Sequence, residues 1–514
     1  VTPIFAKPVQ IIGDSANPVN DFNLILSKYG FRDTFPKKVM AAVQTFSEGS
    51  IAREIPNRRD IRDWTTFTID PESARDFDDA VSIQKTKTGF SLGVHIADVS
   101  FFVTPGSALD REALNRATSV YFTEGVVHML PEELSADLCS LRPEIDRLAM
   151  TALMDIDSAG KVESYDVFPS VIRSDKRFTY EDVQDILDGK TKGRFDQKVQ
   201  LLNKLAGILF KNRSDKGSID FDIPEPVFSM GKGGIPHEIR PSERKQSHRI
   251  VEECMLIANQ TVAELITEKS KKSKLGVYRI HDKPNKDDVS KFLDLISRLG
   301  ISVPAKGKDI SSADFRAILL EVEDSPYKSL IVTVALRTMS KAMYSMKNRG
   351  HFGLAFDRYT HFTSPIRRYP DLAAHRLIRK LHLNDTSYSQ YDRKAVQAAV
   401  DQSNDAEILA LQAEREYIKL KQLRWLDQQD RSSFDGVISG VVQFGLFVEL
   451  KESMAEGLVH VDTMDDSFVY DEDSYSLKGK KSGTEYRLGD PVKVKVVEVL
   501  IDKQRANFVL DDDA

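Results

Sequence analysis

The pattern of apolar and polar positions divides the chain into three parts. The first part, residues 1–60, opens with "AKPVQIIGD" (6–14), which resembles a strand. Two stretches with helical patterns follow, "NDFNLILSKYG" (20–30) and "FPKKVMAAVQTF" (35–46). Asn20 or Asp21 is the candidate N-cap of the first helix, because a short polar side chain can accept from the free N–H groups there.

The middle part, residues 61–427, changes from strand patterns to helix patterns along its length. "FSLGVHIADVSFFV" (90–103) alternates and is rich in β-branched and aromatic residues, which predicts strand structure. Helical patterns follow in 247–270, 329–346 and 396–429. Strands followed by helices indicate a large mixed domain of the α+β class.

The last part, residues 434–514, is predicted to form a small separate domain. It follows a polar linker, "DQQDRSS" (427–433), and contains five short alternating strands with glycine bends. This pattern is typical of a five-stranded OB-fold β-barrel. Phe444, Phe447 and His460 could stack on single-stranded bases, although both phenylalanines would also suit the barrel core.

The composition is that of an ordinary globular protein. The 514 residues are 41% apolar and 29% charged, with a net charge of −6, which still allows a basic groove. Cys139 and Cys254 are the two cysteines, too few for a disulfide framework, and they fit a reducing cytoplasm. No apolar run approaches the ~20 residues that span a membrane. We therefore expect a monomeric cytoplasmic protein without a membrane anchor and, because it begins at Val1, a fragment of a longer chain.

Four aspartates in "TIDPESARDFDDAV" (68–81) form the first candidate site. Asp70, Asp76, Asp78 and Asp79 lie between apolar residues, as in a strand that enters a core. A solvated acidic turn is the plainer interpretation. However, neighbouring carboxylates repel one another unless a cation compensates them. Oxygen ligands without clustered His or Cys favour Mg²⁺, with Mn²⁺ as the alternative.

A second candidate site lies in "HFGLAFDRYTHFTSPIRRYPDLAAHR" (351–376). It contains Arg367 and Arg368 next to hydroxyl side chains. A guanidinium group can donate two parallel hydrogen bonds to the oxygens of one phosphate, so the stretch could hold a phosphodiester. The alternative is an arginine-rich helix start with surface ion pairs.

Four motifs together resemble the ribonuclease II/ribonuclease R family. They are "TIDPESARDFDDAV", "VYFTEGVVHMLPEELSADLCSLRP", "RIVEECMLIAN" and "GHFGLAFDRYTHFTSPIRRYPDLAAHR". The resemblance covers residues 61–427 as an RNB-type catalytic domain, followed by the OB-fold domain, and it is closer to ribonuclease R. Residues 1–60 resemble the remnant of a cold-shock domain and its connector.

The resemblance implies a processive 3′-to-5′ exoribonuclease that hydrolyses single-stranded RNA to nucleoside 5′-monophosphates, in RNA degradation and processing. It assigns Asp70, Asp76 and Asp79 to a divalent metal. Asp78 and Arg367 are the implied catalytic residues, with Arg367 on phosphate.

The resemblance also implies the residues that hold the RNA. Tyr121 is expected to stack on the 3′-terminal base, Phe221 to close the other end of the base stack, and Arg368 to assist its neighbour. Tyr180 and Glu253 are expected near the terminal ribose, where RNA differs from DNA by its 2′-hydroxyl. Spacing from Phe221 favours Glu253 over Glu252.

Two other functions remain open at this stage. A catalytically weak relative could act as an RNA-binding regulator, although all four aspartates are present. The acidic cluster could also serve a metal-dependent phosphatase or endonuclease. Mononucleotide products would distinguish an exonuclease from both.

Overall fold

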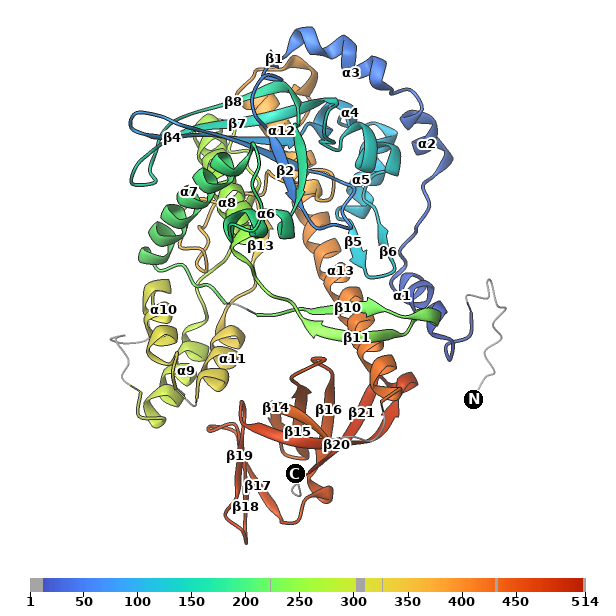
Figure 1. Ribbon diagram of the computed structural model, residues 1–514, viewed down its shortest axis with the longest axis vertical. Coiled ribbons are helices and arrows are strands. Elements are labelled where there is room, and N and C mark those ends of the chain that lie inside the picture. Colours follow the sequence, from blue (N-terminus) through green and yellow to red (C-terminus); the bar gives the residue numbers. More distant parts are fainter. Residues whose placement is uncertain (1–12, 222, 302–309, 326, 430–432, 512–514) are drawn as a thin grey trace.

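The computed structural model describes residues 13–221, 223–301, 310–325, 327–429 and 433–511. It consists of a large α+β body and a small closed β-barrel, which lies below the body in Figure 1. The long helix α13 (Arg393–Asp427) runs from the body down to the barrel. The predicted fold class is therefore confirmed.

The N-terminal segment forms three helices, α1 (Asp21–Tyr29), α2 (Lys37–Val43) and α3 (Glu48–Glu54). The first two are the helices that the sequence predicts. Gly30 ends α1 with a φ of 70°, a backbone conformation that favours glycine. Of the strand expected at 6–14, residues 6–12 lie outside the described residues and residues 13–14 are not in a strand.

A seven-stranded mixed sheet forms the centre of the body, in the order β1-β8-β7-β4-β3-β2-β9. The strands are β1 (Arg59–Asp60), β2 (Phe67–Asp70), β3 (Asp79–Lys85), β4 (Gly89–Ala97), β7 (Asp146–Asp157), β8 (Val162–Arg173) and β9 (Lys176–Thr179). β4 confirms the first part of the strand structure predicted over 90–103, whereas Val99–Phe102 form the helix α4. β4 is central: Leu92, Val94 and Ile96 are fully buried. Its burial on both sides explains why apolar residues outnumber polar ones along it.

Helices cover this sheet and carry the later motifs. Among them α7 (Asp196–Asp215) contacts β3, and α8 (Gln246–Lys269) contacts β4 and β7. α12 (Tyr369–Leu381) packs on α8. The other helices of the body are α4 (Val99–Phe102), α5 (Ala108–Arg116), α6 (Tyr180–Leu187), α9 (Lys286–Arg298), α10 (Ser312–Glu321) and α11 (Lys328–Thr338).

Three short two-stranded sheets complete the body. They are β5 (Val120–Phe122) with β6 (Gly125–Val127), β10 (Pro226–Met230) with β11 (Pro236–Pro241), and β12 (Tyr278–Ile280) with β13 (Met343–Ser345). The last pair corrects the helix predicted over 329–346. The helix ends at Thr338. Tyr344 instead pairs with Arg279 of β12, and its backbone N–H donates to the side chain of Asn404. Pairing with a distant strand overrides the local helical pattern there.

The C-terminal barrel closes through β14-β15-β16-β21-β20. Its strands are β14 (Ser433–Val442), β15 (Gly445–Leu450), β16 (Glu456–His460), β20 (Pro491–Leu500) and β21 (Arg505–Leu510), with a small sheet of β17 (Phe468–Asp471), β18 (Ser476–Gly479) and β19 (Glu485–Arg487) inserted. Phe444 is 48% exposed and its ring is nearly parallel to that of His460. This aromatic is therefore on the barrel surface and not in its core.

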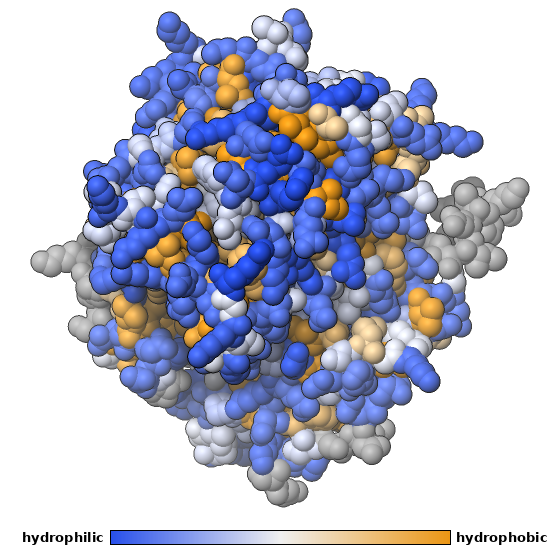
Figure 2. Space-filling view, turned by 45° about the horizontal axis from the view of Figure 1, so that its top comes forward, coloured by the Kyte–Doolittle hydropathy of each residue, from blue (hydrophilic) through white to orange (hydrophobic). Residues whose placement is uncertain are grey.

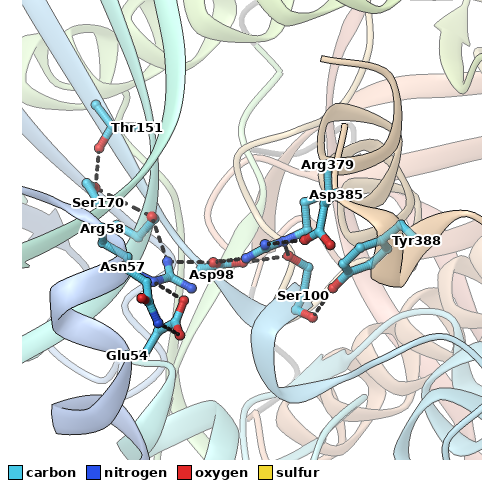
Figure 3. Close-up of polar contacts among 11 residues, drawn as sticks. Glu54, Asn57, Arg58, Asp98, Ser100, Thr151, Ser170, Arg379, Asp385 and Tyr388 are labelled. Carbon is cyan, nitrogen blue, oxygen red and sulfur yellow. Dashed lines mark hydrogen bonds and ion pairs between the residues drawn. The ribbon is translucent and has the colours of Figure 1, made fainter. Parts of the chain in front are cut away.

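A buried ionic network fixes the segment after α3 to the body. Figure 3 shows the Asp98 carboxylate between the guanidinium groups of Arg58 and Arg379, at 2.7 and 2.5 Å. Burial by itself opposes ionisation, but Arg379 and Arg58 hold the pKa of Asp98 well below its usual value. The network therefore joins the segment after α3, the end of β4 and α12.

On the face in Figure 2, hydrophobic side chains form small patches between hydrophilic ones. Within the described ranges, none of the helices combines the length and the apolar composition that a bilayer crossing requires.

Candidate active site

The four aspartates of the first motif line one pocket of about 470 Å³. Asp70 is the last residue of β2 and Asp79 the first of β3, so the intervening loop carries Asp76 and Asp78 to the same edge of the sheet. Only Phe67 and Val81 pair across these two strands. The strands separate beyond that pair, which leaves room for the loop to surround a pocket.

Burial and mutual repulsion disfavour negative charge at this cluster. Burial, and then the charge of Asp79, raise the pKa of Asp70 to about 8. Burial also raises the pKa of Asp79 to about 6 and that of Asp78 well above its usual value. The buried Oδ2 atoms of Asp70 and Asp78 have no hydrogen-bond partner. The unfavourable interactions would be relieved by a cation in the pocket.

The donor set fits a hard divalent cation. It consists of carboxylate oxygens, the ligands that Mg²⁺ prefers. No three His, Cys, Asp or Glu side chains of the described residues stand ready to hold a metal by themselves. Mg²⁺ sites on substrate phosphates commonly use one or two carboxylates and complete the shell with water and phosphate. The pocket therefore suits a metal that is shared between the protein and a phosphodiester.

The arginine motif reaches the same pocket from the other end of the chain. The Ile366 N–H donates to Oδ1 of Asp78 at 2.8 Å, and Nε of Arg367 lies 3.7 Å from Oδ2 of Asp78. The Arg367 side chain is 44% exposed; its Nη2 donates to Oγ of Ser364 at 3.2 Å, and its other N–H groups are available to a ligand. Arg368 instead forms two hydrogen bonds with buried Asp371, at 2.9 and 2.7 Å. These arginines are thus part of a built site and not a surface ion-pair cluster.

Tyr121 lies at the rim of the pocket on the β5–β6 hairpin. Its hydroxyl donates to Oδ2 of Asp76 at 2.7 Å, and the residue is 39% exposed. Burial of the hydroxyl, and next the Asp76 charge, raise its pKa, so the hydroxyl stays protonated as a donor. An exposed ring held at its polar end can stack on a base without regard to base identity.

Tyr180 begins α6 and also lines the pocket. Its ring stacks on that of His248, with centroids 4.1 Å apart. The sequence expectation placed Glu253 beside it, but the structure places Glu252 in the pocket and Glu253 outside it. Glu253 is 2% exposed and accepts from Arg213 at 2.6 Å. Adjacent helical residues point about 100° apart, and the Glu253 side chain is directed to Arg213 of α7.

Phe221 is not brought to this pocket either. It is partly buried and packs against the apolar cluster that includes residues of α9 to α11. Its expected role at the far end of a base stack stays a prediction.

Comparison with known proteins identifies the family of the chain. The RNB domain model matches residues 58–384 and the S1 RNA binding domain model matches residues 428–510. Ribonuclease R of Aquifex aeolicus is 38% identical over 99% of this chain and 73% of its own length. The chain belongs to the ribonuclease R family. Ribonuclease R of Escherichia coli is 37% identical over 99% of this chain, which spans 64% of that relative.

Solved structures of the ribonuclease R family have the same fold. Mycoplasma genitalium RNase R in complex with ribose-methylated single-stranded RNA superposes with a TM-score of 0.91, at 29% identity, over 98% of this chain and 79% of that one. The same enzyme with double-stranded RNA gives 0.87 at 28% identity, over 98% and 85% of the two chains. Yeast Ssd1, described as a pseudonuclease, gives 0.71 at 20% identity, over 91% and 58%, which shows a shared fold alone.

The sequence analysis did not assign a role to several pocket residues. Asn259 donates to the Tyr359 hydroxyl at 3.2 Å and accepts from the Phe362 N–H at 2.8 Å. It thereby holds the arginine motif against α8. The helical period could have indicated this residue, because Glu252 and Asn259 are seven positions apart and therefore lie on one face of α8. His361 also lines the pocket.

Proposed function

We propose that this protein is a processive 3′-to-5′ exoribonuclease that hydrolyses single-stranded RNA and releases nucleoside 5′-monophosphates. The observation that carries the proposal is the convergence, in one pocket of a ribonuclease R chain, of four aspartates, the half-exposed Arg367 and the rim residue Tyr121. The fold alone would not suffice, since a pseudonuclease shares it.

The charges in the pocket fit phosphodiester hydrolysis. We assign Asp70, Asp76 and Asp79 to a Mg²⁺ site that Mn²⁺ could also fill, with each carboxylate acting on the ion directly or through a water molecule. When bound there, such an ion would supply an activated water and neutralise developing charge on the phosphate. Arg367 adds a positive donor for phosphate oxygens, and Arg368, fixed by Asp371, adds positive charge behind it.

Asp78 is proposed to hold the reacting centre in place. Its Oδ1 accepts from the Ile366 backbone, so the carboxylate is fixed against the arginine motif. Its Oδ2 has no hydrogen-bond partner and lies 3.7 Å from Nε of Arg367. This position allows Asp78 to control where Arg367 lies when phosphate enters.

Selection of RNA over DNA is proposed to use Tyr180 together with Glu252. Glu252 replaces Glu253 in this role because it lines the pocket. Arg244 and Arg213 both donate to its carboxylate and so fix its orientation. Glu253 supports this arrangement by holding Arg213.

The remaining expectations concern the whole protein. We propose that the barrel guides single-stranded RNA across Phe444 and His460, which form an exposed aromatic pair. We also propose three domains, 1–60, 61–427 and 434–514, and a monomer that acts in the cytoplasm. The two cysteines are free and buried, which fits a reducing compartment.

One assay tests the proposed function. A 5′-labelled single-stranded RNA is incubated with the protein and Mg²⁺, and the products are resolved on a ladder. A 3′-to-5′ exonuclease shortens the labelled strand one nucleotide at a time and releases 5′-monophosphates. Binding without shortening would indicate an RNA-binding regulator, and internal fragments would indicate an endonuclease.

A further inference from the structure

His361 lines the active-site pocket with one ring nitrogen already engaged. Its Nδ1 lies 2.8 Å from the hydroxyl of Tyr344, a residue of β13 that is 4% exposed. The Tyr344 ring is itself held, because the Arg279 guanidinium lies 4.7 Å from its centroid and pairs with Glu407 at 2.6 Å. His361 therefore sits on a rigid support.

This contact determines which nitrogen of His361 carries the hydrogen. Among the described residues, the Tyr344 hydroxyl has one hydrogen-bond partner, Nδ1 of His361. The buried hydroxyl satisfies its hydrogen only by donating to Nδ1, which must then be the accepting nitrogen. Burial, and next the charges of Arg368 and Arg279, lower the pKa of His361, so the ring is neutral. The hydrogen consequently resides on Nε2.

We infer that His361 is a substrate-binding residue whose Nε2–H donates to a non-bridging oxygen of the RNA backbone. This inference rests on the proposed function. The wall that His361 shares with Arg367 and Arg368 offers donors and positive charge, so its ligand is an anionic acceptor. A phosphodiester has these properties.

The phosphate in question is the neighbour of the scissile one on its 5′ side. Arg367 and the aspartate-bound metal are assigned to the scissile phosphate. Two donors of Arg368 are taken up by Asp371, so His361 supplies a directional hydrogen bond on a wall where Arg368 mainly supplies charge. A neutral donor that is fixed by Tyr344 keeps this role at any pH at which the enzyme works.

Chemically altered RNA tests the contact directly. Single-turnover removal of the 3′-terminal nucleotide is measured on oligonucleotides in which one phosphate at a time is replaced by a neutral methylphosphonate. In the wild type, replacement at the phosphate next to the scissile one should weaken binding or cleavage about 10- to 100-fold, the range for a hydrogen bond to a charged group. In His361→Ala the unmodified RNA should show a similar loss, and this methylphosphonate should cost almost nothing more.

Three further variants make the result specific. His361→Gln can place an amide N–H near the position of Nε2 and should recover part of the sensitivity to that methylphosphonate. Tyr344→Phe leaves the ring in place but no longer fixes the tautomer of His361, so the effect of the methylphosphonate should lie between those in the wild type and in His361→Ala. His237→Ala, on the exposed surface of β11, should match the wild type.

The inference is overturned if His361→Ala keeps the full wild-type methylphosphonate effect at every position. It is also overturned if His361→Ala cleaves unmodified RNA at the wild-type rate. Failure of the proposed function is distinguishable from both outcomes, because the wild type would then release no mononucleotide from unmodified RNA.

Discussion

Asp78 accepts a 2.8 Å hydrogen bond from the backbone N–H of Ile366, a residue 288 positions further along the chain. This bond joins the aspartate motif to the arginine motif, and it uses only one of the two carboxylate oxygens. The other oxygen is buried without a hydrogen-bond partner beside Arg367. The two motifs therefore form one site through a backbone contact that does not depend on the charge of Asp78.

Asp78→Asn should impair cleavage while the protein still folds and binds RNA. The amide oxygen can still accept from Ile366, and a buried charge that is unfavourable in the free protein is removed. We expect cleavage to fall by at least about 100-fold, since a charge used in the transition state is lost, with RNA affinity equal or slightly higher. Filter binding and single-turnover cleavage measure the two effects. Affinity that falls in proportion to activity would contradict the catalytic role.

Removal of divalent metal should abolish activity. Burial and mutual repulsion still raise the pKa of Asp70, Asp78 and Asp79 although arginines lie nearby, so the cluster favours a divalent cation; a chelator should stop hydrolysis and added Mg²⁺ or Mn²⁺ should restore it. Mg²⁺ should also raise the Tm of the wild type, and raise that of Asp79→Asn by less. Thermal unfolding at fixed pH, with and without chelator, provides this second measurement. Hydrolysis that continues in excess chelator would exclude the metal assignment.

Tyr121 should contribute through its ring more than through its hydroxyl. Tyr121→Ala removes a stacking surface worth about 1–3 kcal/mol, so the 3′ end should slip and the shortest product should lengthen. Tyr121→Phe keeps the ring and loses only the bond to Asp76, so its shortest product should match that of the wild type. Product ladders of the two variants run beside each other decide this. An unchanged shortest product in Tyr121→Ala would count against stacking.

Glu252 and Glu253 should give opposite phenotypes. Glu252→Gln should reduce discrimination against a 3′-terminal 2′-deoxynucleotide by about 10-fold or more, because a group that senses a hydroxyl is altered. Glu253→Gln leaves Arg213 without its closest carboxylate and should lower the free energy of unfolding by about 3 kcal/mol. Competition between RNA and the same RNA ending in a 2′-deoxynucleotide, together with urea unfolding, checks both. If Glu253→Gln folds stably and loses discrimination while Glu252→Gln keeps it, Glu253 is the residue near the 2′-hydroxyl, as the sequence predicted.

Asp98 should stabilise the protein in a pH-dependent way. Its lowered pKa means that its ionised form stabilises the folded state above the unfolded pKa of about 3.9, and that this contribution is lost as the pH falls toward the folded value. Asp98→Asn removes the buried carboxylate that Arg58 and Arg379 share, although each keeps one other acidic partner, Glu54 and Asp385, and should cost about 3–5 kcal/mol at pH 7. The difference from the wild type should shrink below pH 4. Urea unfolding across this range measures it, and a constant difference would show that the charge of Asp98 is not the cause.

Much of the site follows from short-range sequence patterns. Four aspartates within ten residues, flanked by strand patterns, must lie near one another because the chain between them is short. Alternation with glycine bends likewise specifies the barrel strands, whose side-chain period of two is local. The helical period could also have chosen between Glu252 and Glu253, but only with knowledge that Asn259 faces the pocket.

Other features depended on contacts between distant parts of the chain. The sequence by itself determined which chemical groups are available: a carboxylate cluster, an arginine motif and aromatic residues able to stack. Only the tertiary structure decided that Ile366 meets Asp78, that residues 343–345 form a strand against β12, and that Tyr344 fixes the hydrogen on His361. The physical reason is that hydrogen-bond partners and burial are set by whichever element packs alongside, and no local pattern encodes that neighbour.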